Sequence, residues 1–357
     1  MKKFLLLSVT ALLFGHCAQT QGCIMIRNIS GFGQFNLADN SFSTSTWQVN
    51  VIGRYFKSFR EFRGTEDVKS PEPGINRVFA SDFSVSRFLN NGFSVNLSLP
   101  VNANSRSTTT EHGGKGTPRH TTHSFGIGDS RLTVYKWLFH PSVHQKVNFQ
   151  IGLGIKLPTG DYKYQDYFYR NDSTKVLAPV NASIQLGDGG TGIITELNGF
   201  YSVNKITNLY LNLYYLLNPR EQNGTLATYG RPATLMQQKT GNDVNSVPDQ
   251  YSMRAGINFN FKQLSFSAGL RQEGIPVYDL IGGSNGFRRS GYNLSVEPGV
   301  VYSLKNISFY TYVPLMVGRT TKQTVPDKIE TEITGNYTVG SGGFANFLVF
   351  AGVLFKL

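Results

Sequence analysis

The chain has 357 residues, of which 40% are hydrophobic and only 16% are charged, and its formal net charge is +12. The basic residues are scattered, with no basic helix and no aromatic RNA-binding motif, so we do not expect a nucleic-acid partner. Together with 38 glycines and 13% aromatic residues, the low charge suits strands that alternate lipid-facing and water-facing positions.

The N-terminus predicts a secretory signal peptide over residues 1–22. Lys2 and Lys3 precede an apolar run from Phe4 to Gly15, which is the charge and hydropathy order of such signals. The signal contains two lysines and no acidic residue, so its removal lowers the net charge from +12 to +10. Attraction to anionic lipopolysaccharide, or to anionic solutes at a pore mouth, is the natural consequence of that charge.

The segment 23–45 separates this signal from the first regular strand. It is interrupted by glycines and alternates only in part, so it predicts a short periplasmic segment or a small plug in a barrel lumen, and we favour the plug. Cys17 would leave with the signal and Cys23 would then stand alone, so no internal disulfide is expected. The stability of the fold must therefore come from backbone hydrogen bonds between many paired strands.

Residues 46–357 repeat one pattern, in which apolar side chains occupy every second position. The clearest case places Phe93, Val95 and Leu97 opposite Ser94 and Asn96, and such a period of two is typical of strands. The pattern predicts about twelve strands, near residues 46–57, 78–88, 93–102, 125–139, 147–157, 192–203, 209–218, 251–261, 264–273, 292–302, 307–316 and 343–357.

The connections between these strands alternate between short and long. Short ones follow the even-numbered strands and long ones follow the odd-numbered strands, whereas a soluble sandwich has no reason to sort its loops in this way. We therefore predict an all-β fold: a closed, antiparallel transmembrane β-barrel with short periplasmic turns, long external loops and both termini on the periplasmic side. Closure satisfies the backbone in lipid, and no amphipathic helical window of useful length suggests a βαβ protein.

The last strand, Gly343 to Leu357, is apolar on one face and ends at the chain terminus. It is long enough to supply the ~9–11 residues that a tilted strand needs to cross a bilayer. We expect it to close the barrel and to be the segment that the barrel assembly machinery binds.

In a barrel the polar positions face the lumen, and charged residues of both signs occur there. They either pair across strands and fill a polar interior, or form a polar wall for a solute path. These candidate lumen charges are Arg54, Asp82, Asp129, Arg131, Lys156, Glu196, Arg254, Arg271, Glu273 and Glu297.

Other lumen positions are aromatic or apolar and fall in two groups. The first group comprises Phe200, Tyr210, Tyr214 and Leu216, and the second comprises Tyr310, Tyr312, Met316, Leu348, Phe350 and Leu354. In a twelve-stranded barrel the two groups would lie on opposite walls, where facing patches could bind an apolar or aromatic solute. Alternatively, they pack against the N-terminal segment or an infolded loop. The two interpretations are compatible, because a plug over an apolar site would gate it.

The histidines offer little support for an enzyme. His112, His120 and His123 fall in one predicted external loop, and His140 and His144 fall in a periplasmic turn. A barrel lipase needs a histidine base beside a serine on a strand face, and no predicted strand contains a histidine. The loop trio could bind a metal, but a polar loop is the simpler interpretation. We therefore predict no catalytic residue, no metal and no cofactor.

Three glycine-rich pieces carry a family resemblance. Gly126–Asp129 opens the fourth strand, the run Lys156-Leu157-Pro158-Thr159-Gly160-Asp161 ends the fifth, and Leu186-Gly187-Asp188-Gly189-Gly190 precedes the sixth. Over about residues 125–200 the chain resembles the outer-membrane barrel family linked to the meta pathway of phenol degradation, which is related to long-chain fatty acid and hydrocarbon transporters. Physically, Pro158 and Gly160 stop the strand ladder and start an external loop.

The resemblance implies passage of hydrophobic or aromatic compounds across the bacterial outer membrane, without naming the compound. We therefore expect an outer-membrane channel whose partners are membrane lipid, small hydrophobic solutes and the barrel assembly machinery. One alternative is a closed structural or surface-binding barrel that displays its external loops. The other, which the histidine positions disfavour, is an outer-membrane lipase.

Overall fold

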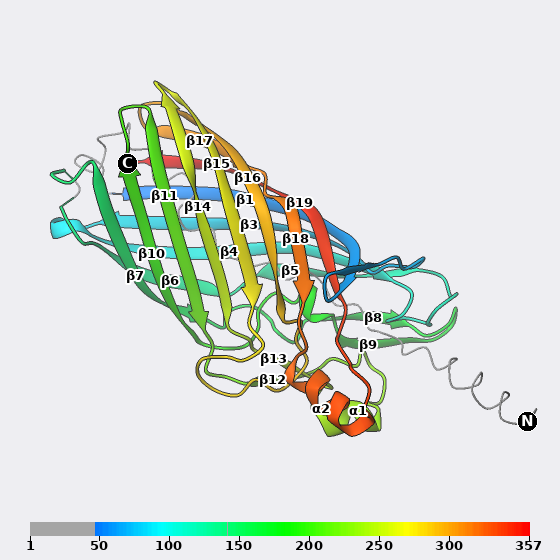
Figure 1. Ribbon diagram of the computed structural model, residues 1–357. Coiled ribbons are helices and arrows are strands. Elements are labelled where there is room, and N and C mark those ends of the chain that lie inside the picture. The colour runs from blue at the N-terminus through cyan, green and yellow to red at the C-terminus, as the bar shows by residue number, and fades with distance from the viewer. Residues whose placement is uncertain (1–46, 141) are drawn as a thin grey trace, which may run out of the picture.

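The computed structural model describes residues 47–140 and 142–357. The predicted signal peptide (1–22) and the predicted N-terminal segment (23–45) lie outside the described residues. The described chain is a closed antiparallel barrel of twelve wall strands, as predicted (Figure 1). Its first strand pairs with its last, with Val51 opposite Val353, and this pairing closes the cylinder.

Ten wall strands are continuous: β1 (Trp47–Arg63), β3 (Ile75–Phe88), β4 (Phe93–Thr108), β7 (Val147–Leu157), β10 (Gly192–Ser202), β11 (Thr207–Leu217), β14 (Gln250–Phe261), β15 (Leu264–Ile275), β16 (Gly291–Ser303) and β19 (Gly342–Lys356). The other two are each broken in two: β5 (His120–Ile127) with β6 (Ser130–Trp137), and β17 (Ile307–Tyr312) with β18 (Leu315–Thr321). The loop lengths alternate around the barrel as predicted, so the longer connections mark the external end.

The strand ends differ from the prediction at the external side. The strand predicted over 46–57 continues to Arg63, and the one predicted over 93–102 continues to Thr108. On these extensions the regular apolar alternation stops, although Phe59 of β1 is still exposed, and backbone pairing continues beyond it. The fourth strand starts earlier than predicted, at His120, so the prediction that no histidine lies within a strand is wrong: His120 and His123 belong to β5.

The two breaks have local causes. Pro314 follows β17, where a proline cannot donate to the ladder. The backbone bends there, and Leu348 N donates to the Pro314 carbonyl at 3.1 Å. Gly128 and Asp129 separate β5 from β6, and Gly128 N donates to the Pro100 carbonyl at 2.7 Å. Among the described strands, β5 pairs only with β4, because β7 ends opposite Ser130.

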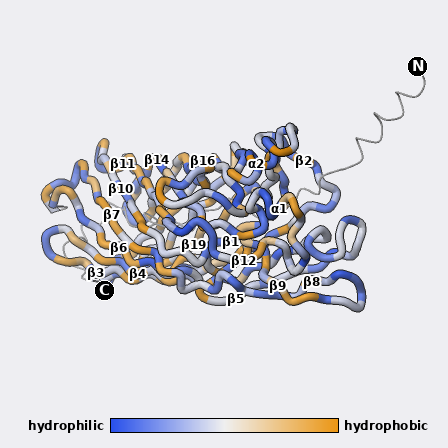
Figure 2. Tube along the Cα trace, turned by 90° about the horizontal axis from the view of Figure 1, so that it is seen from below, coloured by the Kyte–Doolittle hydropathy of each residue, from blue (hydrophilic) through white to orange (hydrophobic). Residues whose placement is uncertain are grey.

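Apolar and hydrophilic residues alternate along the wall (Figure 2). On β1 and β3 the outward-facing Tyr55 and Phe79 are opposite each other and exposed, while the neighbouring Arg54 and Ala80 are buried. An apolar outer surface around a largely polar inner one is the pattern of a barrel in lipid. Within the described part of the chain, no helix is long and apolar enough to cross a membrane.

The external loops carry structure of their own, which the sequence did not predict. They contain β2 (Glu66–Val68), which pairs with the end of β1, and two hairpins, β8 (Gln165–Tyr169) with β9 (Lys175–Pro179) and β12 (Gln222–Leu226) with β13 (Val244–Ser246). They also contain two short helices that pack together, α1 (Leu235–Thr240) and α2 (Val325–Thr334). Thr324 caps α2 through a capping box with Asp327. A helix of this length lacks the long amphipathic window that would have revealed it.

Candidate functional site

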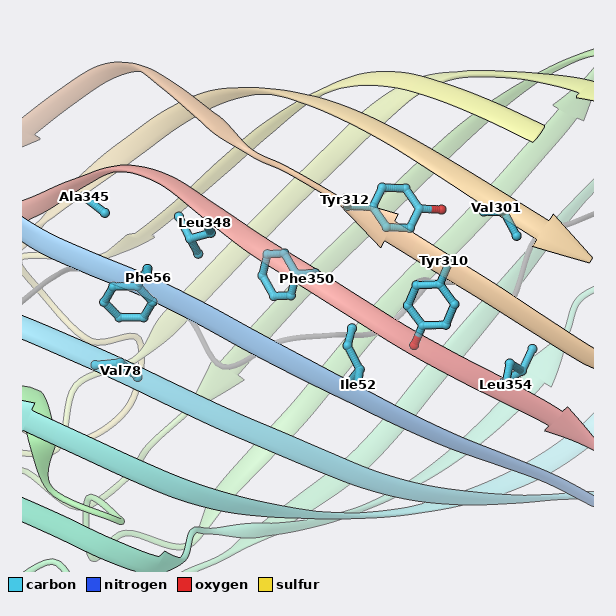
Figure 3. Packing of buried hydrophobic residues seen from close by; sticks show 10 residues of the cluster. All are labelled: Ile52, Phe56, Val78, Val301, Tyr310, Tyr312, Ala345, Leu348, Phe350 and Leu354. Carbon is cyan, nitrogen blue, oxygen red and sulfur yellow. The ribbon is translucent and has the colours of Figure 1, made fainter. Parts of the chain in front are cut away.

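The inner wall carries one extended apolar surface, which we call the inner apolar strip (Figure 3). It runs along the closing seam of the barrel, where β16, β17, β19, β1 and β3 meet. Its members are all buried: Ile52, Phe56, Val78, Val301, Tyr310, Tyr312, Ala345, Leu348, Phe350 and Leu354, with Met316 packed against them. A porin lumen that carries water is lined by polar side chains, so an apolar strip of this extent is suited to apolar matter.

Tyrosine rings on the inner wall lie flat because glycine stands beside them on the next strand. Tyr210 covers the opposed pair Gly256 and Gly269, and a β-carbon at Gly256 would come within 2.7 Å of the Tyr210 hydroxyl oxygen. Tyr135 covers Gly152 in the same way, and its hydroxyl donates to Glu196 Oε2 at 3.1 Å. These rings therefore follow the wall instead of projecting across the lumen.

A hydrogen-bonded belt of polar side chains crosses the inner wall from β7, on the side opposite the closing seam, to β16 at the edge of the seam. From β10, Asn198 Nδ2 donates to Gln150 Oε1 of β7 at 3.3 Å, and from β11, Asn212 Nδ2 donates to Asn198 Oδ1 at 3.0 Å. Arg254 Nη1 of β14 then donates to Asn212 Oδ1 at 3.2 Å. Because each link joins neighbouring strands, the belt holds the side chains against the wall.

The belt ends in buried ion pairs. Arg254 Nε of β14 donates to Glu297 Oε1 of β16 at 2.8 Å. On β15, which lies between these strands, the register partner of Glu297 is Gly269, so no side chain at that position blocks the contact. Arg271 Nη1 lies 3.5 Å from Glu297 Oε2, and Arg271 Nη2 lies 2.8 Å from Glu273 Oε2. The guanidinium of Arg254 also lies 5.7 Å from the centroid of the Tyr210 ring and 5.5 Å from that of Tyr312. The charges are thus compensated in pairs and partly covered by rings.

The three glycine-rich pieces of the sequence meet at the break between β5 and β6, in a cluster that we call the glycine knot (Asp129, Lys156, Thr159, Gly160 and Leu186–Asp188). The Asp129 carboxylate accepts from Gly160 N at 3.0 Å and from Asp188 N at 3.1 Å. The Lys156 ammonium pairs with Asp188 and lies 3.8 Å from Asp129 Oδ2.

Close packing of backbone explains the glycines of this knot. A β-carbon at Gly160 would come 2.7 Å from the Leu186 carbonyl oxygen, and one at Gly187 would come 2.6 Å from the Gly160 carbonyl oxygen. Thr159 Oγ1 also donates to the Gly128 carbonyl at 2.7 Å and accepts from Ser130 N at 2.9 Å. The knot therefore fixes both ends of the loop 158–191 to the broken strand.

This loop folds into the external mouth of the barrel. Its short 3₁₀ turn, η4 (Ala182–Ile184), touches β3 and β4. The Ile184 carbonyl accepts from Asn104 Nδ2 on β4 at 3.3 Å and from the Ser124 hydroxyl on β5. Asn181, just before η4, is completely buried and donates to Glu111 Oε1 at 2.7 Å, and Glu111 also pairs with Arg106 at 2.8 Å. Polar side chains of the inner wall are therefore bonded to the infolded loop.

His112 lies at the junction of three external loops and is fully buried. Its Nδ1 accepts from Tyr169 N at 3.0 Å, and its Nε2 has no hydrogen-bond partner among the described residues. Arg170 Nη1 and the Arg231 guanidinium both donate to its carbonyl oxygen. Burial, and then the neighbouring His120 and Arg170, lower the pKa of His112 to about 4, against a smaller opposite effect of Asp166.

The predicted lumen residues are buried except Met316, which is partly buried. The aromatic residues of the first wall occupy three separate places instead of one patch. Phe200 packs against Trp137, Tyr214 packs with Leu216 and Ile194, and Tyr210 lies beside Arg254. The second group, with Tyr310, Tyr312 and Phe350, belongs to the inner apolar strip. All of the predicted lumen charges are buried, namely Arg54, Asp82, Asp129, Arg131, Lys156, Glu196, Arg254, Arg271, Glu273 and Glu297.

Sequence reasoning missed several polar members of the interior. Asn198 and Asn212 lie in predicted strands but were not among the candidate residues, and Asn181 and Glu111 fall in predicted loops. The signal that could have found the belt is an amide or arginine at the inward position of four successive strands. Within the described ranges, no group of three or more His, Cys, Asp or Glu side chains could hold a metal ion.

No family model and no curated protein sequence matches the chain. Among solved structures, the chain is similar to an outer-membrane channel from Pseudomonas putida F1, at 11% identity and a TM-score of 0.55, over 88% of this chain and 96% of that one. It also aligns with the translocator domain of the autotransporter NalP from Neisseria meningitidis (10% identity, TM-score 0.44, 88% and 89% covered). A third alignment is with the CymD monoaromatic hydrocarbon channel (10% identity, TM-score 0.42, 90% and 91% covered).

At these identities the first likeness establishes the fold alone. The closed cylinder, its apolar outer face and its sorted loops define a bacterial outer-membrane β-barrel protein. The predicted architecture and location are thereby confirmed.

Proposed function

We propose that the protein is an outer-membrane channel that passes small hydrophobic or aromatic solutes. The observation that carries the proposal is the inner apolar strip. Phe350 and Leu354 of β19 and Ile52 and Phe56 of β1 face inward side by side, where a water-filled pore would place polar groups. Burial of an apolar solute against such a strip is favourable in proportion to the apolar area removed from water.

The polar belt and the glycine knot complement this strip. The ion pairs of the belt border the strip, where the Arg254 and Arg271 guanidiniums lie over the rings of Tyr312 and Phe350. Both arginines are paired with glutamates, so a solute that follows the strip meets compensated charges along this border. The knot holds the loop 158–191 over the mouth, which favours a narrow path over a wide aqueous pore. The resemblance to the phenol-degradation family over residues 125–200 supports an aromatic substrate.

Uptake into liposomes by the reconstituted protein tests the proposal. We expect labelled benzoate to enter faster than a sugar of similar size. Phe350→Asn should slow benzoate entry severalfold, because it places an amide in the strip, whereas Phe350→Leu keeps an apolar side chain and should retain uptake. Planar-bilayer conductance records the ion leak of the same proteins. Absence of benzoate uptake even after removal of residues 23–45, in a barrel that remains folded, would contradict the proposal.

The second candidate is a closed barrel that displays its external loops to a binding partner. The bonds between Asn181, Glu111 and Arg106, which tie an external loop to the inner wall, favour it. Deletion of the hairpin β8–β9 that abolishes binding to a partner, with no change in permeability, would support this candidate. A lipase is less suited, because His112 has its Nδ1 occupied by a backbone N–H and would have to serve as base from a buried loop.

A further inference from the structure

Two cations stand directly opposite each other on the outer face of the barrel. Lys57 of β1 and Arg77 of β3 are register partners, and both side chains are exposed. Like charges at directly opposed positions of two strands destabilise the sheet. A pair of this kind is therefore best explained by an anion that lies between them in the membrane.

Their height on the barrel is fixed by their neighbours. The next outward pair on the same strands, one position closer to the periplasm, is Tyr55 opposite Phe79. Tyr55 is 42% exposed and Phe79 is 48% exposed. The following residues of β1 lead into the long connection 64–74, which marks the external end. The two cations thus lie between this aromatic pair and Phe59, the next outward residue of β1, at the external edge of the apolar outer surface.

The surrounding charges leave these two cations uncompensated. Arg60 pairs with Asp67, and His123 Nδ1 lies 3.8 Å from Asp166 Oδ2. Within residues 47–140 and 142–357, neither Lys57 nor Arg77 forms an ion pair with a carboxylate. Lys57 instead lies over the ring of Phe59, with 5.4 Å between its ammonium and the ring centroid, which leaves its charge available to a ligand.

We propose that Lys57 and Arg77 bind a phosphate group of a phosphorylated outer-leaflet glycolipid. The guanidinium of Arg77 can hold two phosphate oxygens at once, and the ammonium of Lys57 adds a point charge from the neighbouring strand. The acyl chains of the same lipid would then lie along Tyr55 and Phe79, so one ligand satisfies both the charged and the apolar part of this surface. The site is independent of the proposed transport path inside the barrel.

Lipid binding to the purified full-length protein in detergent tests the site. The probe is bisphosphorylated lipid A, compared with the same lipid after removal of its phosphates, with phosphatidylglycerol and with inorganic phosphate. The Lys57→Ala/Arg77→Ala double variant should bind lipid A roughly 30-fold more weakly, since each cation near a charged lipid surface contributes about 1 kcal/mol. The control, Arg87→Ala/Lys146→Ala, removes two cations that lie over aromatic rings elsewhere on the barrel, and it should bind like the unmodified protein.

Three results would overturn the proposal. The first is equal lipid A affinity in the double variant and the control variant, when the heat-modified mobility of both on gels shows that both are folded. The second is equal affinity for dephosphorylated lipid A, which would leave only acyl contact. The third is equal affinity for phosphatidylglycerol or for inorganic phosphate, which would mean that the two cations attract any phosphate and select no glycolipid.

Discussion

The hydroxyl of Tyr310 on β17 donates a hydrogen bond of 2.6 Å to Asn50 Oδ1 on β1, across the closing strand β19 that lies between them. The ring of Tyr310 passes over Gly352 of β19, which is its direct register partner. Three strands at the seam are therefore joined by one side chain, in addition to their backbone ladders. The two residues are 260 positions apart in the sequence, so the contact ties the two ends of the barrel sequence together.

Gly352→Ala should weaken this seam. The added β-carbon would come 2.8 Å from Tyr310 Cε2, so the ring must move and the hydrogen bond to Asn50 is lost. We expect a loss of about 1–3 kcal/mol in the free energy of unfolding, measured by urea denaturation in detergent. Gly53→Ala is the matched control on β1, because the nearest atom to its β-carbon is at an ordinary 3.7 Å. Equal destabilisation by both substitutions would contradict the role of the ring.

Glu297→Gln should destabilise the barrel interior. The substitution removes the charge that Arg254 and Arg271 share, and the pair Arg254–Glu297 is almost completely buried. Breaking one partner of a buried pair costs about 3–5 kcal/mol, which the urea midpoint would record. Replacement of both Arg254 and Glu297 by methionine removes the uncompensated charge, and we expect it to recover part of the loss. No recovery would mean that the belt depends on Arg254 through its link to Asn212.

Asp129→Asn should loosen the glycine knot. The carboxylate accepts two backbone N–H groups and lies beside Lys156, and an amide can accept at only one of its two positions. We expect faster proteolysis within the loop 158–191 and a larger ion conductance in planar bilayers. Asp161→Asn serves as control, because among the described residues Asp161 accepts a hydrogen bond only from Lys163 N, at the surface. Unchanged conductance with a released loop would separate the knot from the permeability of the channel.

Acid should release the loops around His112. The pKa of this histidine is lowered from 6.5 to about 4 when the loops are packed around it. His112 therefore binds a proton more readily when the loops are released, so protonation favours the released state. The stabilising contribution is therefore complete above pH 6.5 and is lost as the pH falls toward 4. The groups that face the ring include His120, Arg170 and Arg231, so an added charge is repelled. Amide hydrogen exchange of the loops at pH 7 and pH 4.5, compared under matched intrinsic rates, measures the effect.

His112→Asn supplies the control for this prediction. An asparagine oxygen can accept from Tyr169 N as His112 Nδ1 does, but the amide does not titrate. The variant should keep its loops packed at both pH values. Equal acid release in this variant would assign the response to other groups.

Much of the fold could be predicted because the lipid imposes a period of two on every wall strand. Residues such as Phe93, Val95 and Leu97 face acyl chains on a closed surface, so the pattern repeats along the membrane-facing part of the strand. This alternation no longer predicts the structure in the parts of the strands that extend beyond the lipid. The external extension of β1 to Arg63 and the start of β5 at His120 are held by backbone pairing and loop contacts, which leave no hydropathy signal.

The interior was less accessible to prediction. Alternation places a residue on the inner face, but it does not say which partner that residue finds. Tyr210 was expected to join Tyr214 in one patch, and instead it turns toward Gly256 and Arg254, because glycines on two adjoining strands leave space there. The three glycine-rich pieces were recognised as a motif, yet their assembly around the Asp129 carboxylate depends on loops whose path has no sequence period.

The polar belt has a consequence for how the barrel is made. Its links pass from Gln150 to Asn198, Asn212, Arg254 and Glu297 in the order in which the chain is synthesised. Each added strand can thus bond to the wall strand before it, or in the case of Glu297 to Arg254 two strands earlier, without waiting for distant parts of the polypeptide. Only the union of first and last strands must search a long chain, and this step of biogenesis should be the slowest.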